Sequence, residues 1–175
     1  MPMPRRQITF LLVLCLMLPA CVTVTLRSSA PTVPDARPSP ATATCPVPAR
    51  SAADAPRLVS LINAERARAG LAALTLSPAL SAVAHAFACE AAARGDIGHT
   101  GSDGSTLRER LARGGLASRM AAENNAAGQR LPEAVLDDWM ASPHHRENIL
   151  RPDARQIGVG QADGPWPVWI TDFTS

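Results

Sequence analysis

The amino-acid sequence predicts an α+β domain in which helices are layered on a small, largely antiparallel sheet. Between residues 55 and 175 the patterns predict helices first, then one extended segment, then further helices and finally a pair of strands. Strands that alternated regularly with helices would indicate a parallel sheet instead. The length of 175 residues leaves room for this one domain and a targeting segment, and the sequence contains no internal repeat.

The N-terminal residues 1–20 have the composition of a signal peptide. Two arginines precede an apolar run at 8–18 that is too short to span a bilayer. The tetrapeptide LPAC at 18–21 resembles a bacterial lipobox, so we expect Cys21 to carry lipid after cleavage and to tether the protein to a membrane. The alternative is an ordinary export signal that is cut nearby. Both interpretations predict an exported protein of the cell envelope or the extracellular space.

The charge of the exported chain excludes some classes of partner. The sequence has 17 basic residues, all of them arginine, and 15 acidic residues. Removal of the signal peptide takes away Arg5 and Arg6, so that 15 basic residues face 15 acidic ones. A neutral chain has no electrostatic reason to bind nucleic acid or anionic membranes in general. We therefore expect no nucleic-acid partner, and membrane contact only through a lipid at Cys21.

A spacer is predicted between the signal peptide and the domain. Residues 21–54 are rich in proline, serine, threonine and alanine. Because the repeated prolines prevent a regular hydrogen-bonded ladder, this segment is expected to be extended. It would hold the domain of residues 55–175 away from a membrane surface.

Two helices are predicted at the start of the domain. The first begins near 54–56 and ends at Gly70, since apolar residues recur at helical spacing between these points. The second begins at Ser77, a capping residue that is followed by proline, and carries a long apolar stripe. Asn63 and Arg66 in the first helix are expected to bind backbone carbonyls at a layer boundary.

The remaining predicted elements are shorter. They are a helix at 106–113, an extended segment at 120–127, a helix at 133–140, a short helix that Ser142 caps, and strands at 156–161 and 168–173. Trp139 is expected to anchor the core because an indole buries a large apolar area. Arg146, in the short helix, is expected to hold the neighbouring loop by hydrogen bonds to carbonyls.

Two of the four cysteines remain for the exported domain. They are Cys45 and Cys89, and an oxidising compartment favours a disulfide between them. In the chain-entropy model a loop of this size contributes roughly 4 kcal/mol to stability. The alternative is a free Cys89 buried on an alanine-rich helix.

Three polar residues, His99, Glu123 and His145, are candidate ligands of zinc or another divalent cation. His99 lies in a polar turn, and His145 lies in the first turn of a short helix, where the helix dipole disfavours the charged imidazolium. A His-Glu-His set leaves one coordination position for water. The three residues are too far apart in the sequence for a local metal motif, so a polar cluster that holds loops together is an equally good interpretation. His85, in the middle of a helix, is expected to be structural or to face solvent rather than to act in catalysis.

A nucleophilic serine is a further interpretation of the same region. Ser142 lies three residues before His145, and Glu123 would be the orienting acid. A capping serine, however, has its hydroxyl bound to backbone amides, and no G-x-S-x-G turn surrounds this one. We therefore rank this interpretation below the cation site.

Several motifs, in order along the chain, resemble the CAP superfamily, also called SCP-like, and above all its bacterial branch. They are LINAER at 61–66, GHT at 98–100, AENNA at 122–126, WMASPHHRENIL at 139–150 and IGVG at 157–160. Together they cover nearly the whole exported domain. The resemblance implies a three-layer α-β-α sandwich with a central cleft.

The resemblance also implies which residues line the cleft. Many members of the family place two histidines and two acids there, and some bind zinc or other divalent cations. His99 and His145 take the histidine positions, and Glu123 takes the position of the first acid. Ser142 stands where eukaryotic members have the second acid, and His144 stands where glycine is usual. The implied site therefore has three ligands.

Two functions follow as hypotheses. The first is a non-enzymatic, envelope-associated binding module for a lipid, a small molecule or a protein, whose cleft holds a divalent cation. The alternative is a metal-assisted, peptidase-like hydrolase that uses the same cleft, with Glu123 and His145 as its catalytic residues. No convincing nucleophile supports the second hypothesis, so we favour the first.

Overall fold

The structure is a computed structural model that describes residues 44–175. The predicted signal peptide, the lipobox cysteine Cys21 and the predicted spacer up to residue 43 lie outside the described residues. Within 44–175 no helix is both long enough and apolar enough to cross a membrane.

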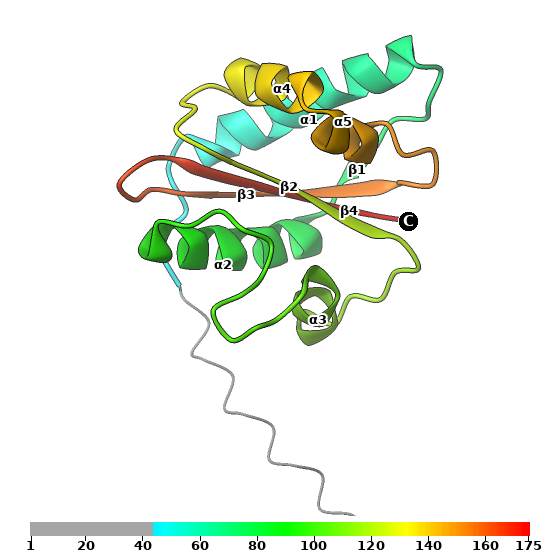
Figure 1. Cartoon of the computed structure of the whole chain (residues 1–175). Coiled ribbons are helices and arrows are strands. Elements are labelled where there is room, and N and C mark those ends of the chain that lie inside the picture. Colours follow the sequence, from blue (N-terminus) through cyan, green and yellow to red (C-terminus); the bar gives the residue numbers. More distant parts are fainter. Residues whose placement is uncertain (1–43) are drawn as a thin grey trace, which may run out of the picture. The chain divides into compact units, whose positions relative to one another are not determined.

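Helices cover both faces of one sheet, as Figure 1 shows. The helices on one face are α1 (Ser51–Arg68), α4 (Pro132–Ala141) and α5 (Pro143–Ile149), and those on the other are α2 (Pro78–Arg94) and α3 (Leu107–Arg113). The strands are β1 (Thr75–Leu76), β2 (Ala121–Ala127), β3 (Gln156–Ala162) and β4 (Val168–Thr174). This arrangement confirms the predicted three-layer α-β-α sandwich.

The sheet has the order β1-β3-β4-β2 and is largely antiparallel, as predicted. Strand β4 pairs antiparallel with both β2 and β3, and Glu123 of β2 lies opposite Asp172 of β4. The short strand β1 pairs parallel with the start of β3. The sequence analysis did not predict β1, because two residues are too few to produce a periodic pattern.

Alternation along the strands separates two apolar cores. Ile157, Val159 and Trp169 face the layer of α1, α4 and α5, where Trp139 is also buried as predicted. Ile170 faces α2 on the other side of the sheet. The glycines of β3 alternate with its apolar residues and face α2. The two helical layers therefore pack against opposite faces of the same strands.

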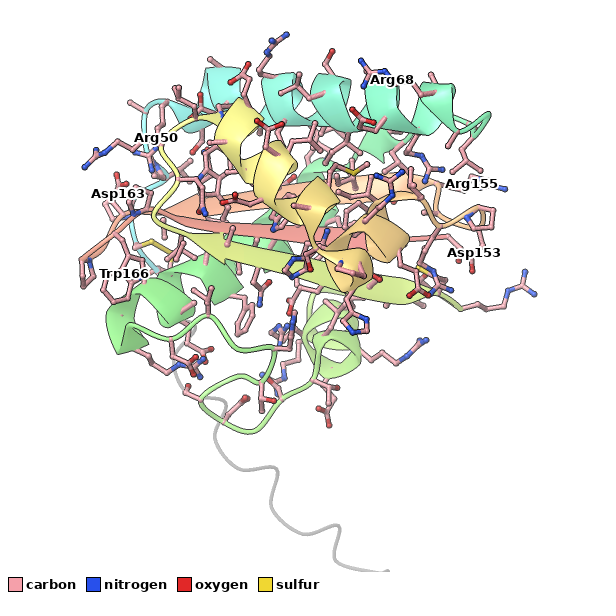
Figure 2. The ribbon with its side chains drawn as sticks, turned by 45° about the horizontal axis from the view of Figure 1, so that its top comes forward. Arg50, Arg68, Asp153, Arg155, Asp163 and Trp166 are labelled. Carbon is pink, nitrogen blue, oxygen red and sulfur yellow. A yellow bond between two sulfur atoms is a disulfide. The ribbon has the colours of Figure 1, made fainter. Side chains whose placement is uncertain are left out.

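Helix α1 begins earlier than the predicted point near 54–56. Its first residue is Ser51, whose amide donates to the carbonyl of Pro48. The guanidinium of Arg50 makes two hydrogen bonds of 2.6 and 3.1 Å to Asp163, which follows β3. Figure 2 shows this pair at one end of the sheet. These long-range contacts order residues that their composition alone assigned to the spacer.

The predicted disulfide between Cys45 and Cys89 is confirmed, with Cα atoms 5.6 Å apart. The predicted roles of Asn63 and Arg66 are confirmed too. The side chain of Asn63 exchanges two hydrogen bonds with the backbone of Leu74, at 2.8 and 3.0 Å. The buried guanidinium of Arg66 donates to four backbone carbonyls in the segments that follow α1 and α5.

Candidate functional site

The residues that the resemblance implies for the cleft gather around β2, which forms one edge of the sheet. Successive side chains of a strand point to opposite faces, so neighbouring residues of AENNA serve different layers. Glu123 points toward α3, where it contacts Arg110, while Asn124 points toward α5. The edge strand therefore connects the two helical layers at this position.

The carboxylate of Glu123 has a charged or ionisable partner on each of its oxygens. Oε1 lies 2.8 Å from Nδ1 of His99, and Oε2 accepts a hydrogen bond of 2.5 Å from Nη2 of Arg110. Both Glu123 and Arg110 are buried, with side chains 3% and 8% exposed. A buried charge must be paired, and here the pair is internal to the protein.

Arg110 is held firmly in its place. Its guanidinium carbon lies 3.7 Å from the centre of the Phe87 ring on α2. Its Nη1 donates to the carbonyls of His99 and Ser105, at 3.1 Å each. The same arginine thus neutralises Glu123 and fixes the loop that carries His99.

A second carboxyl group, that of Asp172, lies beside Glu123 on β4. Asp172 is 1% exposed, and burial raises its pKa well above the usual range for an aspartate. The neighbouring charge of Glu123 raises the pKa further, while Arg110 opposes the shift. The protonated form of Asp172 is therefore favoured.

His99 presents the exposed side of the cluster. Its side chain is 60% exposed, in the loop between α2 and α3. The hydrogen bond to Glu123 raises the pKa of His99, and the negative charge of that residue adds to the effect. Asn125 supports the loop through hydrogen bonds to the carbonyls of Ile97 and Gly98, at 3.0 and 3.2 Å. His99 is therefore a positioned donor at the surface.

His145 approaches the same edge from the opposite layer. Asn124 donates to the backbone carbonyl of His145 at 3.0 Å, and Asn148 donates to Oδ1 of Asn124 at 2.9 Å. The imidazole lies 6.4 Å from the ring of Trp139, between ring centroids. Burial lowers the pKa of His145, and a charge on His99 lowers it further, so its neutral form is favoured.

The donor chemistry does not fit a preformed divalent-cation site at His99, Glu123 and His145. The oxygens of Glu123 are already engaged by Arg110 and by Nδ1 of His99. Within residues 44–175, the group of three candidate ligands whose atoms all lie within 4.8 Å of one another is Cys45, His85 and Cys89 instead. Arg110 supplies in this cluster the positive charge that a cation would bring.

The structure corrects two expectations about α5. Ser142 stands at the N-cap position, but its side chain makes no capping hydrogen bond. Its hydroxyl is therefore not committed to the backbone, although no contact with His145 activates it either among the described residues. Arg146 is exposed and its side chain makes no hydrogen bond within 44–175. Arg66 performs the predicted role instead, because its guanidinium binds the carbonyl of Ile149 at 2.8 Å.

Sequence reasoning brought His99 and Glu123 together correctly but missed several of their partners. Arg110 lies on a short helix with the sequence LRERLAR, which has four charged residues. Their spacing does not indicate which of them contacts Glu123. Asp172 lies in an apolar strand, and an acid in such a position is itself a signal of a buried site. Asn124 and Asn148, each within a motif that carried the resemblance, position His145.

Comparisons with known proteins place these features in a family. Residues 59–169 match the sequence profile described as CAP, the cysteine-rich secretory protein family. A relative from Bacillus subtilis (strain 168), the uncharacterized protein YkwD, is 33% identical over 140 residues. The match covers 77% of this chain and 54% of the relative, so the chain spans about half the length of that protein.

Solved structures show the same fold. An extracellular protein containing an SCP domain from Bacillus anthracis is 28% identical, with a TM-score of 0.64 over 68% of this chain and 39% of that one. An outer surface protein from Borrelia burgdorferi is 24% identical, with a TM-score of 0.67 over 71% of this chain and 94% of that one. The second likeness shows the fold alone.

Proposed function

The chain belongs to the CAP family of extracellular proteins, and we propose that it is a non-enzymatic binding module of the cell envelope. In this proposal the cleft at the edge of β2 binds a partner and leaves its covalent bonds unchanged. The observation that carries the proposal is the double engagement of Glu123 by His99 and Arg110. A general base needs a carboxylate oxygen that is free to accept a proton from its substrate, and both oxygens of Glu123 already contact groups of the protein.

The rim of the cleft supports recognition of hydrogen-bond acceptors and anionic groups. His99 is exposed, and its raised pKa favours a form with two N–H donors. His144 and Arg146 are also exposed, at the start of α5. The partner is therefore expected to present carboxylate, phosphate or carbonyl oxygens. Lipid, small-molecule and protein partners all offer such groups.

The confirmed disulfide and the extracellular relatives support an exported location. A lipid at Cys21 would place the module at a membrane, and the spacer would set its reach. Mass determination of the protein recovered from cell membranes tests this part of the proposal. Added lipid mass that is lost in Cys21→Ser is the expected result.

Imidazole signals in nuclear magnetic resonance test the binding cleft. The full chain, labelled at histidine, is titrated with solubilised cell-wall fragments in one arm and with anionic phospholipid vesicles in the other. Binding at the cleft should shift the signals of His99 and His145 and spare that of His85. No shift with either probe would contradict the cleft as a binding surface for the envelope.

The same samples separate a binding module from a hydrolase. After incubation, the fragments are recovered and weighed by mass spectrometry, and their masses should be unchanged. Cleavage products that disappear with Glu123→Gln, in a variant that melts at the parent temperature, would establish the metal-assisted hydrolase instead.

Calorimetry with zinc alone tests the cation hypothesis. We expect the oxidised full chain, with Cys15→Ser and Cys21→Ser, to show no heat that depends on the cleft, because Arg110 already neutralises Glu123. The matched variants are His99→Ala and His145→Ala in the same background. Zinc binding by the parent that both variants lose would show that the cleft holds a cation after all.

A further inference from the structure

We propose that Cys45, His85 and Cys89 form a zinc site that becomes available when the disulfide between the two cysteines is reduced. Cys45 precedes α1, and the other two residues lie one helical turn apart on α2. Figure 2 shows the disulfide near the end of the sheet that carries Arg50 and Asp163. None of the three proposed ligands belongs to the cleft at β2, so this inference does not depend on the proposed function.

The separation of nitrogen and sulfur already suits a tetrahedral site. Nε2 of His85 lies 3.5 Å from Sγ of Cys89. With zinc–sulfur and zinc–nitrogen bonds of about 2.3 and about 2.0 Å, tetrahedral angles place these ligand atoms about 3.5 Å apart. The sulfur atoms must separate to about 3.8 Å by the same geometry. Once the bond is broken, rotation of the two cysteine side chains can separate the sulfur atoms to this distance, because the Cα atoms are 5.6 Å apart.

Electron-rich atoms converge on His85 from both sides. Nδ1 lies 2.8 Å from the carbonyl oxygen of Gln161, and Nε2 lies 3.1 Å from that of Cys45. A carbonyl only accepts hydrogen bonds, whereas neutral imidazole has a single N–H. When Nδ1 donates at the shorter contact, the Nε2 lone pair faces oxygen and sulfur atoms with no proton between them. Once the disulfide is reduced, a cation at this point binds Nε2 of His85 together with the two cysteine sulfur atoms.

The surroundings also supply the support that metal ligands usually have. A ligating histidine commonly donates its second N–H to a backbone carbonyl, which fixes the ring and its tautomer. The contact between Nδ1 of His85 and Gln161 has this geometry. The backbone amide of Cys45 lies 3.2 Å from Sγ of Cys89, and a donor there stabilises a thiolate.

A surface pocket reaches His85, one of the three proposed ligands. It has a volume of about 260 Å³, and its lining includes Val47, Ser51, Ser81 and His85. Cys45 and His85 are half-buried, while Cys89 is buried. A small reductant and a hydrated cation can therefore approach His85 and Cys45 from this side, whereas Cys89 belongs to the apolar core beneath α2.

The chemistry consists of two balanced steps. A low-molecular-weight thiol attacks the disulfide, and a second thiol completes the exchange, so that two cysteine thiols form and the reductant leaves as its own disulfide. Zinc then binds the two thiolates and Nε2 of His85, and two protons are released to solvent. Exchange with the reductant's own disulfide re-forms the bridge and, with two protons taken from solvent, yields two low-molecular-weight thiols. This expels the cation, because a disulfide sulfur carries no negative charge to bind it. The bridge thus controls whether the site exists.

Cobalt absorption tests the proposal, with Co²⁺ in place of spectroscopically silent Zn²⁺. The full chain with Cys15→Ser and Cys21→Ser is used, so that Cys45 and Cys89 are its only cysteines. It is reduced with a trialkylphosphine, which consumes one water and becomes the phosphine oxide. We expect thiolate-to-cobalt charge-transfer and tetrahedral visible bands at one equivalent, their loss when Zn²⁺ is added, and no bands in the oxidised chain.

Matched variants identify the ligands. His85→Ala should weaken cobalt binding at least tenfold, whereas His144→Ala, which removes an exposed imidazole, should leave it unchanged. Absence of bands in the reduced parent would overturn the proposal, as would equal binding by the oxidised chain or by His85→Ala. Circular dichroism follows the fold in parallel. If reduction unfolds the domain, refolding on addition of Zn²⁺ supports the site, and failure to refold overturns it.

Discussion

Arg66 links α1 to the segments that surround β1 and α5. Its side chain is completely buried, and its guanidinium donates to the carbonyls of Ala72, Ile149, Arg151 and Ala154 at 2.8 to 3.4 Å. Burial lowers its pKa. Because each of these carbonyls is the end of a turn or helix, one residue closes several chain reversals.

Replacement of this arginine should therefore be costly. We expect Arg66→Met to lower the free energy of unfolding by roughly 2–4 kcal/mol, since the apolar side chain leaves buried carbonyls without donors. Arg146→Met is the matched control, because its side chain is exposed, and it should change the same quantity by less than about 0.5 kcal/mol. Urea denaturation measures both. Equal effects of the two substitutions would contradict this role for Arg66.

Asp103 contributes stability that depends on pH. Hydrogen bonds from Ser105 and the guanidinium of Arg113 lower its pKa to about 2 from an ordinary 3.8. A carboxyl whose pKa is lowered on folding stabilises the protein above its unfolded pKa, and this stability disappears as the pH falls through the folded value.

The substitution Asp103→Asn should therefore lower the melting temperature at neutral pH. The difference from the parent should shrink as the pH falls below 3.8 and should vanish only below about pH 2. Thermal melts followed by circular dichroism across this range measure it. A difference that stays constant down to pH 2 would show that the carboxylate charge is not the cause.

At the scale of elements, the contact between α2 and β3 depends on glycine. A Cβ built on Gly160 would lie 2.2 Å from the carbonyl carbon of Ala84, and one on Gly158 would lie 2.4 Å from that of Leu80. The side chains Ser81 and His85 then bind the edge of β3, at the amide of Val159 and the carbonyl of Gln161. The helix thus replaces a neighbouring strand.

The backbone of α2 lies so close to Gly160 that no side chain fits between them. Gly160→Ala should therefore destabilise the protein. We expect a loss of roughly 1–3 kcal/mol in the free energy of unfolding, because the backbones of α2 and β3 must separate. Gly98→Ala is the control, since its nearest contact would be an ordinary 3.4 Å to Asp96, and it should change stability by less than about 0.5 kcal/mol. Denaturant unfolding of both variants measures these changes in the free energy of unfolding. A tolerated Gly160→Ala would mean that the helix can shift freely.

For the whole molecule, the disulfide connects the N-terminal segment to α2 across 44 residues. Replacement of Cys45 and Cys89 by serine should lower the free energy of unfolding by up to about 4 kcal/mol, because the unfolded chain regains the entropy of an open loop. Chemical denaturation of the double variant, compared with the oxidised parent, gives the value. A loss below about 1 kcal/mol would show that the unfolded chain is already compact in this region.

The fold was largely predictable because its helices and hairpin are local features. Thr106 and Glu109 form the capping box that starts α3, and Ser77 caps α2. The cleft was predictable only in part. His99 and Glu123 lie within motifs that the resemblance matched, whereas Arg110 occupies an ordinary helical pattern. Which of several arginines faces a buried acid depends on how α3 docks against β2, and spacing along the chain does not encode that.

The sequence by itself determined the α+β class and the family, because periodicity, capping residues and ordered motifs are properties of short segments, and it favoured the disulfide that the structure then confirmed. Tertiary structure alone decided three further matters. It brought the guanidinium of Arg110 to Glu123, so that Arg110 supplies the positive charge that a cation was expected to supply. It set His145 in the opposite layer from Glu123, and it brought His85 to the disulfide. In each case residues distant in sequence meet because two helical layers close on one sheet, and the energy of that packing is a property of the whole chain.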